Sequence, residues 1–163
     1  ARASAKNAPS ATVAAVKMPG VNIAGGVADR EVGAMLRLDE QFIHLGRGAT
    51  ALPQPAFTGI EWYESYATHH EADGPEGRLV AQHRFTSDWD AWEVHPHGAE
   101  VVICTQGRIT LIQQAADGGE TRITLAPGDY AINPPGVWHT ADIAEPATAI
   151  FITPGLDTDH RPR

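Results

Sequence analysis

Short runs of apolar and β-branched residues, separated by turn residues, follow one another along most of the chain. Examples are "AEVVICTQG" (99–107) and "RITLIQQAA" (108–116), in which Val, Ile and Thr are frequent. Such residues favour strands, whereas segments such as "ADGPEG" (72–77) and "ADGGE" (116–120) favour turns. Frequent turns between short strands, with no helical periods between them, predict an all-β fold, an antiparallel sandwich or barrel.

The same pattern leaves room for at most one short helix. We interpret "FTGIEWYESYATHH" (57–70) as one of the strands, because it contains β-branched and aromatic residues. The one credible helix falls in "GVADREVGAMLRLDEQ" (26–41), with Asp29 as its N-cap and an apolar face formed by Val32, Met35 and Leu36.

Four segments follow from these patterns. Residues 1–20 lack apolar periodicity and end in Pro-Gly, which predicts a flexible N-terminal arm. Residues 21–77 are expected to supply N-terminal strands and the short helix, packed on the barrel. Residues 78–155 are expected to form the barrel core, and residues 156–163 a polar C-terminal tail.

Length and charge narrow the class of protein. A chain of 163 residues is the size of one ordinary domain. Its formal net charge of −8, from 20 acidic against 12 basic residues, argues against binding to a phosphate backbone or an anionic lipid surface. Its apolar stretches, such as "AIFI" (149–152), are too short to span a bilayer. We therefore expect a soluble protein with neither nucleic acid nor membrane as a partner.

The single cysteine bears on the compartment. Cys104 cannot form an intrachain disulfide, and its place in "VVICT" predicts a small buried hydrophobe rather than a nucleophile. A lone buried thiol fits a reducing compartment, so we expect a cytoplasmic protein. The alanine-rich residues 1–15 leave the alternative that they follow a removed leader, which would make the protein an exported form.

The candidate chemistry lies in "EVHPHGAE" (93–100). A strand projects residues i and i+2 onto one face, so Glu93 and His95 point the same way. Pro96 cannot donate to a strand ladder, which predicts a turn over residues 96–98. The chain can then return with Glu100 at the start of the next strand, beside His95.

A second histidine, His139, lies at the start of another strand in "GDYAINPPGVWHT", and with these residues the chain resembles the cupin superfamily, whose fold is a small jelly-roll β-barrel. Cupins carry two motifs, G-x5-H-x-H-x(3 or 4)-E-x6-G and G-x5-P-x-G-x2-H-x3-N. The second is matched by Gly128, Pro134, Gly136 and His139, with Ile143 in place of the final asparagine. The resemblance covers roughly residues 78–153.

The first motif is matched only in part, by Glu100 and Gly107, and Ser87 stands where its opening glycine is expected. Counting back from Glu100, the longer-spaced version of the motif places its paired ligands at Glu93 and His95. The alternative pair, His95 and His97, leaves two residues before Glu100, fewer than the motif allows. We therefore favour Glu93, His95, Glu100 and His139 as the metal ligands, with His97 in a turn.

Such a set suits a divalent metal ion. Imidazole and carboxylate ligands together fit Fe, Mn, Ni, Zn or Co, and the resemblance implies dioxygenase, isomerase or lyase chemistry on a small molecule. We expect a dioxygenase-like oxidoreductase that acts on a small oxygenated metabolite, with Glu93 or Glu100 available to move a proton. The alternatives are an isomerase or lyase, a barrel that binds a sugar or metabolite without turnover, and a structural or storage role. The resemblance also implies a homodimer.

The remaining histidines and the tryptophans predict no second site. His69 and His70 approach a polar loop, and solvated roles are expected for both. His44, His83 and His160 stand alone in the sequence and are assigned structural or solvent roles. The tryptophans Trp89, Trp92 and Trp138 are assigned to packing.

Overall fold

The fold is given by a computed structural model that describes residues 35–163. The expected N-terminal arm and the first part of the helix predicted at 26–41 lie outside the described residues. The strands are β1 (Ile43–Gly46), β2 (Thr50–Pro53), β3 (Arg78–Phe85), β4 (Ala91–Val94), β5 (Glu100–Gln114), β6 (Glu120–Leu125), β7 (Tyr130–Asn133), β8 (His139–Thr153) and β9 (Asp159–Pro162). The helical elements are α1 (Ile60–His70) and the short 3-10 helices η1 (Arg47–Ala49) and η2 (Glu71–Glu76).

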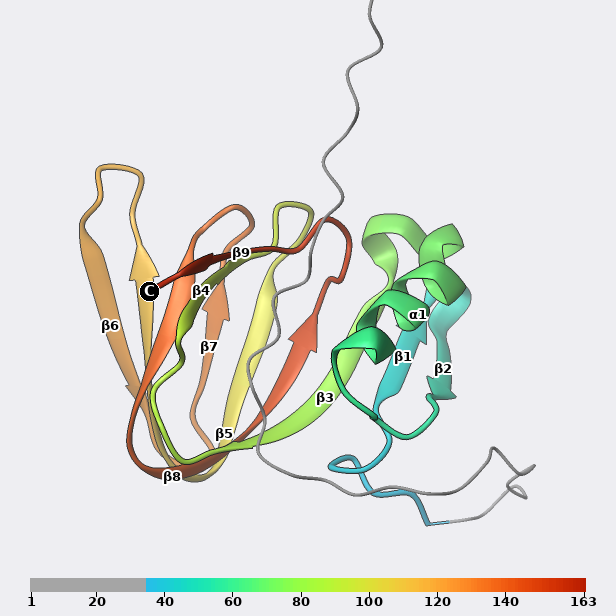
Figure 1. The fold of residues 1–163 in the computed structure, drawn as a ribbon, viewed down its shortest axis with the longest axis horizontal. Helices are drawn as coiled ribbons and strands as arrows, with labels where there is room; N and C mark the ends of the chain where they lie inside the picture. Colours follow the sequence, from blue (N-terminus) through green and yellow to red (C-terminus); the bar gives the residue numbers. More distant parts are fainter. Residues whose placement is uncertain (1–34) are drawn as a thin grey trace, which may run out of the picture.

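All of the strand pairs are antiparallel, and the predicted all-β barrel fold is confirmed. One path through the sheet runs β2-β1-β3-β8-β4-β9, while β5 pairs with β6, β7 and β8. The two longest strands, β5 and β8, pair from Val101↔Ile152 to Gln113↔His139. They bend together, so that β4 and β9 lie across from β6 and β7 in the barrel (Figure 1).

The α-helix of the described residues lies in a segment that the sequence assigned to a strand. Residues 35–41 form a turn without helix, and the helix α1 occupies the segment that was interpreted as a strand. Its aromatic residues follow the helical spacing rather than alternation, since Trp62 and Tyr66 lie four residues apart and their rings stack at 5.3 Å. β-propensity misled the prediction because aromatic residues favour any half-buried surface.

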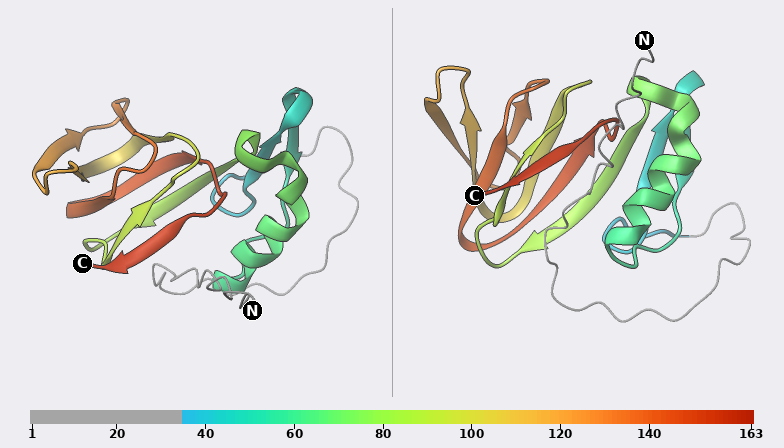
Figure 2. Two further views of the ribbon diagram at one scale, coloured as in Figure 1. Left: turned by 90° about the horizontal axis from the view of Figure 1, so that it is seen from above. Right: turned by 45° about the horizontal axis from the view of Figure 1, so that its top comes forward.

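Two hydrophobic clusters hold these elements together. The larger fills the barrel and consists of Phe85, Trp89, Val102, Cys104, Ile109, Leu111, Leu125, Ala131, Ala141, Ile143, Ala147, Ala149 and Phe151. The smaller packs α1 against β3 and the segment before β1, through Phe42, Trp62, Leu79 and Ala81. The helix lies along β1 and β2, on the side of the molecule away from β6 (Figure 2). Cys104 is fully buried, as the sequence predicted.

Gly107 lies within a strand, although the sequence pattern divided this stretch into two runs, 99–107 and 108–116. β5 continues through it to Gln114, and its pairing with β8 shifts register on both sides of this residue. Gly107 has φ +67, and a Cβ there would lie 1.9 Å from the carbonyl oxygen of Pro146. The glycine therefore marks a bulge where two backbones approach closely, and this bulge lets one long strand bend.

We expect Gly107→Ala to lower the free energy of unfolding by about 3 kcal/mol or more, because the methyl group meets backbone and the left-handed conformation is disfavoured. The matched control is Gly118→Ala, at φ +85 with no atom within 4 Å of the added Cβ. It should cost only about 1 kcal/mol. Urea denaturation measures both, and equal losses would contradict the role of the close approach.

Candidate metal centre

The four residues favoured as ligands come from separate parts of the barrel wall. Glu93 lies on β4, where it stands opposite His139, the first residue of β8. His95 follows the end of β4, and Glu100 is the first residue of β5. The turn predicted at residues 96–98 is present and brings Glu100 back beside His95.

These side chains meet at one point in the interior. The Glu100 carboxylate lies between two imidazoles, with Oε1 at 3.4 Å from His95 Nε2 and Oε2 at 3.2 Å from His139 Nε2. Glu93 Oε1 lies 3.8 Å from His95 Nε2. The side chains of His95, Glu100 and His139 are at most 3% exposed, whereas that of Glu93 is 21% exposed. The structure thus brings all four residues together.

The hydrogen bonds of the two imidazoles fix which nitrogen carries the proton. His139 donates Nδ1–H to the carbonyl oxygen of Val137 at 3.1 Å, and His95 Nδ1 lies 2.9 Å from the hydroxyl of Thr158. That hydroxyl can donate to the carbonyl oxygen of Gly155, so it is free to accept from His95. In a neutral His139 ring, Nε2 therefore presents a lone pair to Glu100, and Nε2 of His95 does the same when its Nδ1 donates to Thr158.

The two imidazoles and the Glu100 carboxylate need a positive charge between them. His95 Nε2 and His139 Nε2 are buried and have no hydrogen-bond partner within residues 35–163. An ionised carboxylate only accepts hydrogen bonds, so lone pairs would face lone pairs unless a proton or a metal ion lies between them. Two imidazoles beside carboxylates are ligands that suit Fe, Mn, Ni, Zn or Co, and the residues present fit such an ion.

The charged side chains of this centre shift one another's pKa values. Burial by itself would raise the pKa of Glu100, but His139 and His95 hold that pKa well below its usual range. Burial likewise opposes a charge on His139, and the Glu100 carboxylate more than offsets this and raises the pKa of His139. For Glu93, burial raises the pKa, but the hydrogen bond from His160 and the charges of His95 and His139 together outweigh it, and the pKa is lowered. Both carboxylates are therefore ionised at neutral pH.

Neighbouring side chains hold the Glu100 carboxylate in place. Asn133 donates to Oε2 at 2.9 Å, and Thr153 donates to Oε1 at 2.6 Å. Asn133 is itself held by Gln113, whose amide donates to Asn133 Oδ1 at 2.8 Å. These contacts come from β5, β7 and β8, so three strands fix the orientation of one carboxylate.

His97, the alternative ligand, lies outside this group. Its side chain is 45% exposed, and its Nε2 lies 2.9 Å from Asp157 Oδ2 at the surface. It occupies the turn that the sequence predicted for it. The geometry thus favours Glu93 over His97 as the partner of His95.

The sequence missed one residue of the centre, His160. The segment assigned to a polar tail contains the strand β9, which pairs with β4 so that His160 stands opposite Glu93. His160 donates Nε2–H to Glu93 Oε1 at 3.2 Å, and its side chain is 7% exposed. No apolar residue in "DHRP" indicates a strand, so the local pattern carried no signal for it.

An arginine next to His160 anchors this strand. The guanidinium of Arg161 lies over the ring of Trp138 at 4.4 Å and near that of Trp92 at 5.4 Å. It also donates to Gln114 Oε1 at 2.5 Å. Trp92 and Trp89 are buried, which agrees with the packing role predicted for both. The Arg161 contacts therefore position β9, and with it His160.

We expect Glu93→Ala to lose most of the metal bound by the purified chain, because it removes a carboxylate that faces both imidazoles. The matched change His97→Ala should lose little, because His97 contacts only Asp157 at the surface. Elemental analysis of the two variants beside the parent chain measures this. The reverse outcome would return the ligand assignment to His97.

We expect His160→Phe to weaken metal affinity about 10- to 100-fold, because it removes the hydrogen bond that orients Glu93. His160→Gln keeps an N–H donor and should recover part of the loss. Competition with a chelating dye measures the affinity, and circular dichroism of the metal-free variants checks their fold. Equal affinities for the Phe variant and the parent chain would argue against this role.

Comparisons with known proteins bear on the fold and the family. Residues 86–153, which contain β4 to β8, match the family model described as the cupin domain. A search of curated proteins finds no match to this chain.

Several solved structures are similar to part of this chain. A cupin-2 domain containing protein from Shewanella frigidimarina has 22% identity, covering 47% of this chain and 70% of that one, with a TM-score of 0.41. A conserved protein with a double-stranded β-helix domain from Klebsiella pneumoniae has 24% identity, covering 53% and 76%, with a TM-score of 0.44. Hydroquinone 1,2-dioxygenase from Sphingomonas sp. TTNP3 has 19% identity, covering 47% and 59%, with a TM-score of 0.40. The family match supports the cupin superfamily for residues 86–153 of the chain.

Proposed function

We propose that this cupin barrel is a metal-dependent enzyme that acts on a small oxygenated metabolite, with dioxygenase-like chemistry. The observation that carries the proposal is the pair of buried Nε2 atoms, on His95 and His139, that face the Glu100 carboxylate without a hydrogen bond. Lone pairs arranged in this way favour a metal ion over a packed, purely structural interior.

Four side chains of this chain would hold the ion: Glu93, His95, Glu100 and His139. His95, His139 and Glu100 are buried and oriented by second hydrogen bonds, as metal ligands require. When bound, the ion would supply a Lewis acid and a template for an enol, a carboxyl group or a vicinal oxygen pair. Two histidines and two carboxylates leave positions of a six-coordinate ion open, which suits oxygen chemistry.

Glu93 supports isomerase or lyase chemistry as the second candidate. It is the most exposed carboxylate of the centre, and His160 holds one of its oxygens. A carboxylate that is ionised, oriented and within reach of solvent can take a proton from a bound substrate when it does not coordinate the ion. The two carboxylates also place negative charge in the site, which disfavours strongly anionic substrates.

The other expectations about partners remain predictions. A small-molecule substrate follows from the buried centre, and a homodimer follows from the family resemblance. Among residues 35–163, no helix is long and apolar enough to cross a membrane. The expected lack of nucleic-acid partners rests on the acidic net charge of −8.

Oxygen uptake tests the proposal. The chain is loaded in turn with Fe(II), Mn(II) or Zn(II) and mixed with enols, hydroxylated aromatic rings and hydroxy acids in an oxygen electrode. We expect metal-dependent oxygen uptake with at least one compound, and loss of that uptake in His139→Ala. His97→Ala serves as the control and should retain it, because His97 lies outside the centre.

Product analysis of the same mixtures separates the alternatives. Conversion of a compound without oxygen uptake would indicate an isomerase or lyase rather than a dioxygenase. The Glu93→Gln variant should then fail to convert that compound. Saturable binding without any conversion would favour a barrel that only captures its ligand. Failure of all three metals to bind would overturn the metal-dependent enzyme.

A further inference from the structure

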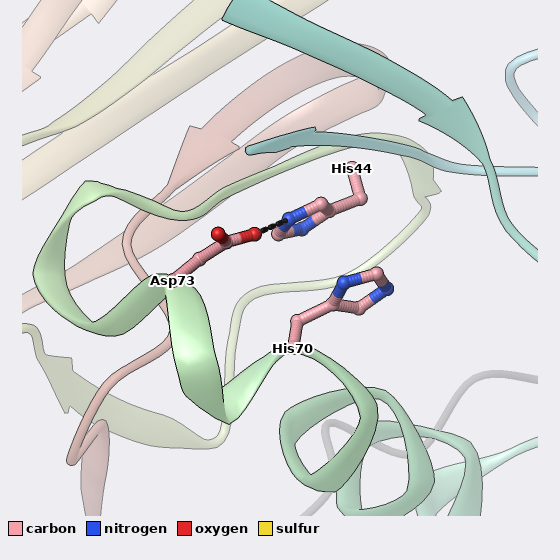
Figure 3. Close-up of side chains that lie close together, drawn as sticks. All are labelled: His44, His70 and Asp73. Carbon is pink, nitrogen blue, oxygen red and sulfur yellow. Dashed lines mark hydrogen bonds and ion pairs between the residues drawn. The ribbon is translucent and has the colours of Figure 1, made fainter. Parts of the chain in front are cut away.

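A second cluster of metal-ligand residues lies outside the matched cupin segment, where α1 and η2 meet β1. It consists of His44 on β1, His70 at the last position of α1, and Asp73 in η2. The sequence does not predict that these residues meet, because His44 is 26 residues from His70 and 29 residues from Asp73. In the fold, one ligand atom from each lies within 4.8 Å of the others (Figure 3).

The three side chains face one another closely. His44 Nε2 lies 2.7 Å from Asp73 Oδ2, and the His44 and His70 rings stack at 3.6 Å with 16° between their planes. His44 is 1% exposed, whereas the Asp73 side chain is 24% exposed. The cluster is therefore closed on the side of the sheet and reaches solvent through Asp73.

Neighbouring groups fix the proton positions on both rings. Gln54 donates its amide to the carbonyl oxygen of Leu52 at 3.1 Å, which leaves its Oε1 to accept from His70 Nε2–H at 2.9 Å. His70 Nδ1 therefore carries a lone pair, and Figure 3 shows this nitrogen on the side of His44. On His44, Nε2 donates to Asp73, and Nδ1 lies 2.8 Å from the hydroxyl of Tyr66.

A glycine leaves the space in which these atoms converge. A Cβ on Gly46 would lie 2.6 Å from Asp73 Oδ2, 2.7 Å from Thr50 Oγ1 and 2.9 Å from His44 Nε2. Gly46 has φ −107 and ψ −177, an extended conformation that any residue adopts. A side chain at this position would therefore displace the side-chain ends of Asp73, Thr50 and His44, although the backbone angles would allow it.

We propose that His44 Nε2, His70 Nδ1 and a carboxylate oxygen of Asp73 bind a second divalent ion of the zinc class. Two imidazoles and one carboxylate favour zinc over calcium or magnesium, which take oxygen ligands. Zinc–ligand distances of about 2.0 to 2.2 Å require His44 Nε2 and Asp73 Oδ2 to separate by roughly half an ångström. The His70 ring must also turn out of its stack on His44, so that the in-plane lone pairs of both rings point at one ion. A water molecule would complete the tetrahedron.

The proton balance of the site is simple. The ion takes the place of the proton on His44 Nε2, and that proton moves to Nδ1 of the same ring. Nδ1–H then donates a hydrogen bond to the Tyr66 oxygen. An outer hydrogen bond of this kind is the usual support of a metal-bound histidine. His70 binds without losing a proton, because its Nδ1 carries none.

The bound ion would strengthen the connection between elements that already meet through a small apolar cluster and the hydrogen bonds of His44 and His70. Within the described residues, α1 packs on β3 and the segment before β1 through the cluster around Phe42 and Trp62. An ion held by His44, His70 and Asp73 would add metal–ligand bonds to the hydrogen bonds that already join α1 and η2 to β1. The bound ion should therefore raise the melting temperature of the chain.

Zinc stoichiometry of the full chain, measured by native mass spectrometry at buffered free zinc, tests the site. If both centres bind zinc, the parent chain should hold two ions, His70→Ala one and His139→Ala one. The matched control is His69→Ala, which should hold two, because His69 is exposed and its Nδ1 bonds only to the Ser65 carbonyl within α1. If the barrel binds no zinc, the parent chain should hold one ion and His70→Ala none, which separates failure of the barrel centre from failure of this site.

A second variant distinguishes loss of the zinc site from unfolding of the chain. Asp73→Asn can still accept the hydrogen bond of His44 through its amide oxygen but is a poor zinc ligand. It should keep the circular dichroism of the parent chain, lose one ion, and lose the rise in melting temperature that zinc gives the parent chain. Parent-like stoichiometry in both His70→Ala and Asp73→Asn would overturn the site.

Discussion

The buried carboxylate of Glu100 is the constraint on which the barrel centre depends. An ionised carboxylate at 3% exposure is costly unless hydrogen-bond donors and positive charge surround it. Asn133 and Thr153 supply the donors, and His95 and His139 supply groups that can bind a proton or a metal ion. Because these partners lie on or next to four different strands, satisfying one charge aligns β4, β5, β7 and β8.

The centre also depends on residues beyond the family motifs. The last strand, β9, pairs with β4 and places His160 on Glu93, the carboxylate that stands where the motif has a histidine. The C-terminal Arg163 fixes the end of this strand through Asp142 and the Ala141 carbonyl. The imidazole of His160 therefore lies near the position where the motif has a histidine. It acts through Glu93 and comes from another part of the chain.

Both polar clusters of the molecule follow one physical logic. In each, a buried histidine has one nitrogen held by a neighbouring oxygen and the other directed at a carboxylate. Orienting one nitrogen fixes the chemistry of the other, because a neutral imidazole carries one proton. In the barrel this leaves orphaned lone pairs, whereas at α1 the His44 hydrogen bonds are all made.

The sequence by itself determined the local pattern of the fold and most of the barrel centre. Alternation placed Glu93 and His95 on one face, Pro96 predicted the turn, and the spacing to Glu100 and His139 followed from the motifs. These features depend on neighbours within a few residues, which a single sequence displays directly.

Only the tertiary structure decided the rest, because register between strands far apart in the chain is set by long-range pairing. His160 reaches Glu93 through the pairing of β9 with β4, and His44 meets Asp73 only after α1 folds back onto β1. The identity of α1 was ambiguous for a related reason, since aromatic residues suit a strand or a helix and packing on Phe42 selects the helix. The local sequence thus identifies the candidate reactive side chains, and contacts between distant parts of the chain determine which of them meet.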